Sequence, residues 1–127
     1  MQVTFSAQTI RGAGRGTKEL QCPTINLRLS DVPSALNHGI YACLVRIENE
    51  QLLRNAVAHY GPRPVFEDDT SFEVHLLDEA PDEPPRQISV TIVGERIRDV
   101  RDFPSADALK QEMKRDIAKA RAMLSSL

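Results

Sequence analysis

Apolar and polar residues alternate along most of the chain. A period of two places successive side chains on opposite faces of an extended backbone, so it predicts β-strands with one buried face. In the first such segment, Val3, Phe5 and Ala7 would share one face with Thr9. Strands are expected over residues 2–11, 23–29, 39–47, 52–60, 71–78 and 87–93.

The residues between these segments include turn formers that would end the strands. The Gly-Pro-Arg-Pro run at residues 61–64 is expected to break the fourth strand, and Gly94 to bend the chain after the last one. Residues 80–85 form a proline-rich acidic loop. Residues 49–51 are a tight connection, so the strands on either side of it should pair as a hairpin.

One helix is expected, at the end of the chain. Apolar residues recur there at steps of three and four and form one stripe: Leu109, Met113, Ile117, Ala120, Leu124 and Leu127. Ser105 is a suitable N-cap, and Asp107 places a negative charge in the first turn. The stripe should pack against the sheet, with no chemical role. These elements predict a mainly β fold, a small antiparallel barrel of about six strands with an amphipathic C-terminal helix packed on it.

Composition fits an ordinary globular domain. The 127 residues are 41% hydrophobic and 27% charged, so a single domain over residues 1–127 is expected. A net charge of −2 offers no basic surface, so nucleic acid is not an expected partner. No apolar run approaches the roughly 20 residues of a membrane span, and no secretory signal begins the chain, so a cytoplasmic protein without membrane contact is predicted. Cys22 and Cys43 should be buried and unpaired.

A glycine-rich segment lies between the first two predicted strands. Residues 11–20, RGAGRGTKEL, contain three glycines and the cations Arg11, Arg15 and Lys18. Glycine lets backbone amides approach a ligand closely, and the cations add positive potential, so the segment suits a phosphate group. It leads into an extended Pro-Thr segment and lacks GK[ST], so neither a dinucleotide fingerprint nor a Walker loop is predicted.

Two polar residues face away from the apolar side of the second predicted strand. Ile25 and Leu27 share one face, so Thr24 and Asn26 project from the other, roughly 7 Å apart at two residues of strand rise. Their oxygens could reach one Mg²⁺ ion or one phosphate. The alternative is a half-buried strand whose outer face is simply polar. Residues 64–85 carry eight acidic residues and no Lys or Arg, which would allow a carboxylate to meet the cationic loop across a site.

The glycine-rich segment followed by Pro-Thr-Ile-Asn at residues 23–26 resembles the nucleotide loop and Pro-Thr-x-Asn motif of the riboflavin kinase (flavokinase) family. Further family motifs follow in order at residues 39–42, 61–64, 72–77 and 98–103, and then the helix, so the resemblance covers about residues 2–124. It implies a Greek-key barrel. The chain resembles the single-domain, monofunctional kinases, which lack the adenylyltransferase domain of the bifunctional enzymes, so FAD formation is not expected.

The resemblance also implies an activity and a set of site residues. The family transfers the γ-phosphoryl group of ATP to the 5′-hydroxyl of riboflavin, giving ADP and FMN. By motif position, Glu73 would be the base for the ribityl hydroxyl, and Thr24 and Asn26 would hold Mg²⁺ and the phosphates. Nucleotide contacts are implied for Gly12, Gly14, Lys18, Leu76 and Asp78, and flavin contacts for Arg98 and Arg101. ATP and riboflavin are the expected partners, and a monomer is expected.

The chain departs from the family pattern at Gln21, residues 82–85, Val100 and His59. None of these is assigned to the chemistry, so altered ligand affinity is the expected consequence. Two other classes of function stay open, a flavin-binding module that does not turn over and an interaction domain without a ligand. No pair of histidines has metal-ligand spacing, so structural or turn roles are expected for His38, His59 and His75.

Overall fold

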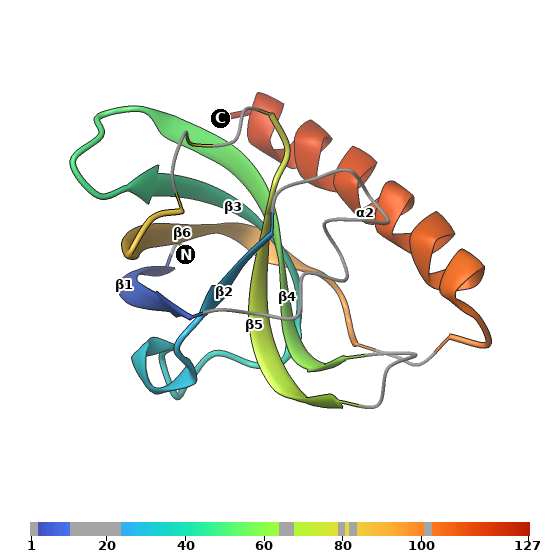
Figure 1. Ribbon diagram of the computed structural model, residues 1–127. Helices are drawn as coiled ribbons and strands as arrows, with labels where there is room; N and C mark the ends of the chain where they lie inside the picture. The colour runs from blue at the N-terminus through green and yellow to red at the C-terminus, as the bar shows by residue number, and fades with distance from the viewer. Residues whose placement is uncertain (1–2, 11–23, 64–67, 79–80, 82–83, 101–102) are drawn as a thin grey trace.

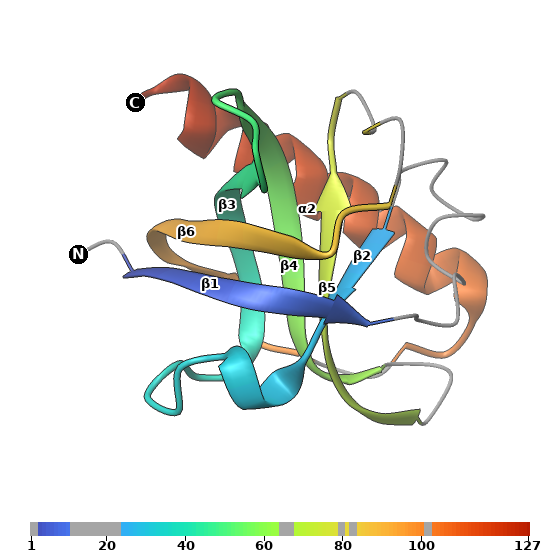
Figure 2. The same cartoon turned by 60° about the vertical axis from the view of Figure 1, so that its left-hand side comes forward.

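Six strands form a closed antiparallel barrel, and one long helix lies on its outside (Figures 1 and 2). The computed structural model describes residues 3–10, 24–63, 68–78, 81, 84–100 and 103–127. The elements are β1 (Val3–Ile10), β2 (Thr24–Leu27), a 3-10 turn η1 (Leu29–Asp31), β3 (Gly39–Ile47), β4 (Leu53–Arg63), β5 (Asp68–Leu76), β6 (Gln87–Arg98) and α2 (Ala106–Ser125). The predicted mainly β fold with a C-terminal helix is confirmed.

The strands follow the order β1-β2-β5-β4-β3-β6 around the barrel, and β1 and β6 close it. Strands β3, β4 and β5 pair in sequence, whereas β2 pairs with β5 and not with β3. This crossing connection is the Greek-key arrangement. Its consequence for function is that β2 and β5, which are distant in sequence, lie side by side (Figure 2).

The interior of the barrel is filled by apolar side chains from alternate positions. On β5, Phe72, Val74 and Leu76 point inward and are almost completely buried, as the alternation predicts. Phe72 contacts the ring of Phe5 at 5.7 Å between centroids and that of Tyr60 at 5.3 Å. The barrel interior is therefore a packed core and not a channel.

A second apolar cluster lies between the barrel and α2. Val57 and Leu77 on the outside of the barrel pack there with Ala120 and Leu124 of the helix. The N-cap prediction is confirmed, because Ser105 Oγ accepts a hydrogen bond from the backbone N–H of Ala108 at 3.1 Å. α2 thus covers one side of the barrel (Figure 1).

The last residue of the predicted stripe, Leu127, is an error of the sequence analysis. The helix ends at Ser125, and Leu127 is 65% exposed. Helical spacing continues only while the helix does, so this side chain never reaches the barrel.

The expected break at residues 61–64 is also wrong, because β4 runs on to Arg63. Its pairing with β3 ends where Tyr60 lies opposite Gly39, and beyond that point it pairs with β5 alone. Proline lacks an N–H group and is tolerated where a strand has a neighbour on one side only. Pro62 occupies such a position, opposite Thr70 of β5.

Gly94 bends its strand without ending it. β6 continues to Arg98, and its register with β3 shifts between Ile40 and Ala42, which marks a β-bulge. Gly94 has a φ of 69°, a conformation that glycine adopts without strain. The extension matters because it carries Arg98 to the helix.

Cys43 is fully buried and unpaired, as expected, and burial raises the pKa of its thiol. Cys22 lies outside the described residues. In the part of the chain that the structure describes, the helix is too polar to span a bilayer.

Candidate active site

A row of polar side chains crosses β2, β5 and β4 on the outer face of the barrel. Asn26 of β2 lies opposite Glu73 of β5, and Glu73 lies opposite His59 of β4. In the adjacent row, Thr24 lies opposite His75. Directly opposed residues of antiparallel strands have their Cβ atoms about 4.5–5.5 Å apart. The structure therefore brings together the hydroxyl, amide and carboxylate that the sequence analysis singled out.

The burial of the opposite faces fixes this register. A slip of one residue along β2 would turn Ile25 and Leu27 out of the core and place Asn26 inside it. The apolar positions of the core thus determine where the polar row lies.

Thr24 is held by a buried histidine. Its Oγ1 lies 3.1 Å from Nδ1 of His75, within hydrogen-bonding distance. Burial lowers the pKa of His75 to about 4, so its ring is neutral at pH 7. A neutral imidazole can either accept from the hydroxyl or donate to it. The hydroxyl of Thr24 is therefore oriented and not free to rotate.

Asn26 is only 6% exposed, and its Oδ1 has no hydrogen-bond partner among the described residues. A buried acceptor left unpaired costs about 1–3 kcal/mol. Asparagine is also uncommon in strands. An amide oxygen in this state is suited to a cation or to a donor from a ligand.

The oxygens of Thr24 and Asn26 fit a magnesium ion that also binds phosphate. Mg²⁺ prefers hard oxygen ligands and usually keeps several from water and from substrate phosphates. Within the described ranges, no group of at least three His, Cys, Asp or Glu side chains is placed to hold a metal. Two neutral protein oxygens would therefore need phosphate and water to complete the coordination of the ion.

Glu73 lies between these oxygens and β4. It is half-buried, and Ser71 Oγ donates a hydrogen bond to its Oε2 at 3.1 Å. Ser71 lies on the same face two residues earlier, so this contact follows from the strand period. The carboxylate is thus supported from its own strand.

His59, on the far side of Glu73, is 8% exposed. Burial lowers its pKa to about 4, His75 and Arg98 lower it further, and the charge of Glu73 acts in the opposite direction. At neutral pH the ring is uncharged. A small cavity of about 10 Å³ separates it from α2, with Arg98 and Asp116 also in its wall.

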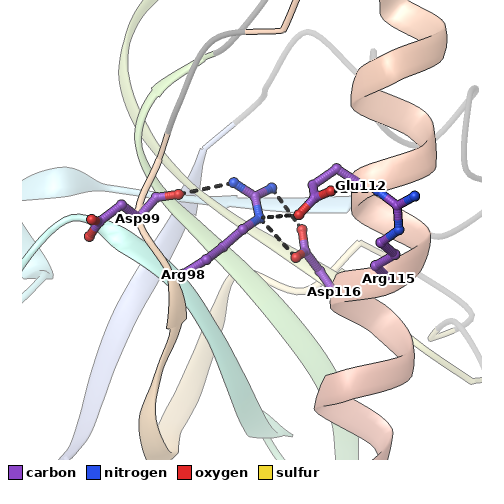
Figure 3. A network of polar contacts seen from close by, with 5 residues as sticks. All are labelled: Arg98, Asp99, Glu112, Arg115 and Asp116. Atoms are coloured by element: carbon purple, nitrogen blue, oxygen red, sulfur yellow. Dashed lines mark hydrogen bonds and ion pairs between the residues drawn. The ribbon is translucent and has the colours of Figure 1, made fainter.

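Arg98 is bound to the helix (Figure 3). Its guanidinium donates to both carboxylate oxygens of Asp116, at 2.9 and 2.8 Å, and to the backbone oxygen of Asp99 at 3.0 Å. Glu112 lies 3.6 Å from its Nε, and the ring of Phe103 lies 5.4 Å from its Cζ. A flavin contact by Arg98 would have to be made by a side chain already in this network.

The remaining predicted positions differ in what the structure shows. The side chain of Leu76 is inside the barrel, so only its backbone could border a nucleotide. Asp78 is exposed and accepts a hydrogen bond from Arg121 at 3.1 Å. Four predicted residues lie outside the described part of the chain: Gly12, Gly14, Lys18 and Arg101.

The sequence analysis expected structural or turn roles for His75 and His59, and the buried contact of His75 with Thr24 is such a structural role. The shared face of Glu73 and His75 follows from their spacing of two. The places of His59 and Asp116 in the site could not be predicted, since they depend on the β4 register and on how the helix packs.

A larger hollow of about 930 Å³ lies at one end of the barrel. His38 and Tyr60 form part of its wall, with ring centroids 4.7 Å apart, and Arg96 donates to the backbone oxygen of His38 at 2.8 Å. Asp99 and Val100 border it on the β6 side. The segments that form the hollow meet only in the folded chain, so no sequence motif marks it.

The fold is a small closed β-barrel, and the polar row is a candidate ligand site on its outer face. The family model described as "Flavokinase: Riboflavin kinase" matches residues 1–124. The chain belongs to the flavokinase family.

Two curated relatives are bifunctional riboflavin kinase/FMN adenylyltransferases. The protein from Pseudomonas fluorescens is 34% identical over 108 residues, which is 84% of this chain and 33% of that protein. The protein from Haemophilus influenzae is 32% identical over 105 residues, which is 82% of this chain and 33% of that protein. The chain spans about a third of the length of the curated relatives it matches.

Solved structures share the fold. A protein from Streptococcus pneumoniae described as a macrolide-efflux protein superposes with a TM-score of 0.75 and 28% identity, over 93% of this chain and 38% of that one. Riboflavin kinase from Trypanosoma brucei superposes with a TM-score of 0.61 and 19% identity, over 98% of this chain and 80% of that one. The second likeness bears on the fold alone.

Proposed function

We propose that this protein is a riboflavin kinase, which transfers the γ-phosphoryl group of ATP to the 5′-hydroxyl of riboflavin and gives FMN and ADP. Membership of the flavokinase family supports the reaction. The observation that carries the residue assignment is the register that sets Glu73 beside Asn26, one residue pair from Thr24.

Phosphoryl transfer depends mainly on positioning and charge neutralisation, because the protein forms no covalent bond to the phosphoryl group. Glu73 accepts the proton of the ribityl 5′-hydroxyl while the new O–P bond forms and the bond to ADP breaks. Ser71 donates to the same carboxylate and so limits its rotation. The role of Glu73 requires an ionised carboxylate facing the alcohol.

Thr24 and Asn26 would hold Mg²⁺, which would offset the negative charge of the phosphate groups. His75 keeps the hydroxyl of Thr24 in one orientation through its contact at 3.1 Å. The unpaired Oδ1 of Asn26 is relieved of its cost once it has a ligand. The site is thus better satisfied with substrate than without.

The other assignments belong to the same proposal. Gly12, Gly14 and Lys18 lie along the ATP phosphates, the backbone at Leu76 and the exposed Asp78 border the nucleotide, and Arg98 and Arg101 lie near the flavin. We further propose a monomer that acts in the cytoplasm, with ATP and riboflavin as its ligands and no nucleic-acid partner.

Incubation of the purified chain with riboflavin, ATP and Mg²⁺ tests the proposal. Chromatography should show FMN and ADP forming in equal amounts, and none when Mg²⁺ is chelated. Riboflavin that is bound but unchanged would contradict the kinase and indicate a binding module. Absence of any thermal stabilisation by riboflavin or Mg-ADP would contradict both.

A further inference from the structure

His59 lies at the β4 end of the polar row and has no role in the reaction described above. Its side chain is more than nine-tenths buried, and neither ring nitrogen has a hydrogen-bond partner among the described residues. A buried polar atom without a partner destabilises a fold, and an apolar side chain would fill the same space without that effect. The ring therefore points to a polar group that comes from a ligand.

The order of the row indicates which part of a ligand reaches His59. Asn26, Glu73 and His59 follow one another on β2, β5 and β4, and neighbouring strands lie about 4.7–4.9 Å apart. In phosphoryl transfer the attacking and leaving oxygens lie roughly in line, on opposite sides of the phosphorus. With the phosphates bound at Thr24 and Asn26, the acceptor alcohol lies on the β4 side of the phosphorus. The acceptor molecule therefore extends from Glu73 toward His59.

The cavity beside the ring has room for one small polar group. Its volume of about 10 Å³ is close to the smallest that holds a water molecule, and a hydroxyl group is of similar size. Its polar wall consists of His59, His75, Arg98 and Asp116. Arg98 and Asp116 bind each other, and His75 contacts Thr24. His59 is thus the polar wall residue whose side chain makes no hydrogen bond within the described ranges.

The hydroxyl next to the reacting one has the chemistry that this ring requires. In riboflavin, the carbon beside the 5′-carbon carries the 4′-hydroxyl, and hydroxyls on adjacent carbons are close neighbours. When the 5′-hydroxyl is at Glu73, the 4′-hydroxyl is one short step along the chain toward β4. The ring of His59 is uncharged at neutral pH, so it has one N–H and one lone pair. A hydroxyl also donates and accepts, so the two groups can pair in either direction.

We propose, on the basis of the kinase activity above, that His59 is a specificity-determining residue that binds the 4′-hydroxyl of riboflavin, beside the hydroxyl that is phosphorylated. The ligand supplies the hydrogen bond that the ring lacks in the ligand-free protein. An acceptor without this hydroxyl leaves the buried ring unpaired, so the site selects a polyhydroxylated chain over a simple alcohol of the same length. Contacts at two adjacent hydroxyls also fix the rotation of the bond between their carbons.

Binding of riboflavin and of 4′-deoxyriboflavin tests the contact. Dissociation constants are measured from flavin fluorescence, with Mg-ADP present, for the parent protein, His59→Leu and Ile40→Val. The parent should bind riboflavin about 10- to 100-fold more tightly than the analogue. His59→Leu should bind the two flavins within about 2-fold of each other, because its binding of riboflavin weakens. Ile40→Val changes the wall of the same cavity without a polar atom, so it should keep the parent's preference. An equal preference in His59→Leu and the parent would overturn the proposal.

FMN formation by the parent protein, followed in parallel, separates this inference from the kinase proposal on which it rests. If the parent makes FMN but binds the two flavins equally, the role of His59 is wrong and the kinase stands. If the parent prefers riboflavin, His59→Leu does not, and no FMN forms, the hydroxyl contact is supported and the kinase proposal fails. If the parent neither binds riboflavin nor makes FMN, both are overturned.

Discussion

The two faces of β5 have different roles. Phe72, Val74 and Leu76 fill the barrel interior, where the described side chains are apolar and closely packed. Glu73 and His75, from the same segment, face outward toward Asn26 and His59, whose buried polar atoms include some without a hydrogen-bond partner among the described residues. The interior supplies stability, and the outer face gives up some stability for groups that a ligand can use.

This difference explains how a strand of only four residues would carry the proposed site residues Thr24 and Asn26. β2 is short, but Leu27 and Ile25 anchor it in the core. Because these two side chains are buried, the register of β2 with β5 is fixed, and Thr24 and Asn26 keep their positions along the strand relative to Glu73. A site on rigid, paired strands is more precise than one on loops, because ladder hydrogen bonds restrict each residue.

Truncation in the interior should have the largest effect on stability. Phe72→Ala removes a fully buried ring that contacts Phe5 and Tyr60, so we expect a loss of about 3–5 kcal/mol in the free energy of unfolding. Urea denaturation followed by circular dichroism measures it. A loss below that of Val57→Ala, on the outer face, would contradict the assignment of stability to the interior.

Removal of one partner of the ion pair between β6 and α2 should cost nearly as much. Asp116→Ala leaves the Arg98 guanidinium without its bidentate partner, and we expect a loss of about 3 kcal/mol. The same denaturation measurement applies. Arg115→Ala is the control, since the Arg115 side chain is exposed and pairs with the half-buried Glu112 at 3.0 Å. If the two variants lost similar amounts of unfolding free energy, the ion pair with Asp116 would contribute no more to stability than that of the exposed Arg115.

Acid should destabilise the outer face selectively. The pKa of His59 and that of His75 are both lowered to about 4, from an ordinary value of 6.5. The unfolded chain therefore binds more protons between these values, and stability is complete above pH 6.5 and falls toward pH 4. Between pH 7 and pH 5 each imidazole should account for about 2 kcal/mol. Denaturation across this range checks the slope, which His59→Asn should reduce. If His59→Asn left the dependence of the free energy of unfolding on pH unchanged, His59 would have to be exposed to water in the folded protein.

The smallest change in stability should accompany a complete loss of function. Asn26→Leu puts an apolar side chain of similar size in place of a buried amide, whose Oδ1 has no partner in the part of the chain that the structure describes. We expect the free energy of unfolding to stay the same or rise by about 1 kcal/mol, while FMN formation is lost. A protein that is markedly less stable would mean that the amide is satisfied without a ligand.

The sequence predicts the local features of the fold and only part of the site. Alternation defines the faces of β5, and capping chemistry identifies Ser105 as the start of the helix. Pro62 caused the wrong prediction of a strand break. Proline is excluded only from strands paired on both sides, and the local sequence does not show how many strands pair with a given segment. The ion pair of Arg98 with Asp116 depends on where the C-terminal end of β6 lies relative to the helix. Long-range register of this kind is absent from any short motif.

The central claim is that Glu73 of the outer face accepts the proton of the riboflavin 5′-hydroxyl. The most direct test compares FMN formation by the parent protein and by Glu73→Gln, with riboflavin affinity and unfolding measured in parallel. Glutamine keeps the shape and an oxygen for Ser71 but cannot take the proton, so kcat should fall about 100- to 1000-fold while affinity and stability change little. Equal kcat values in the two proteins would remove Glu73 from the reaction and contradict the account.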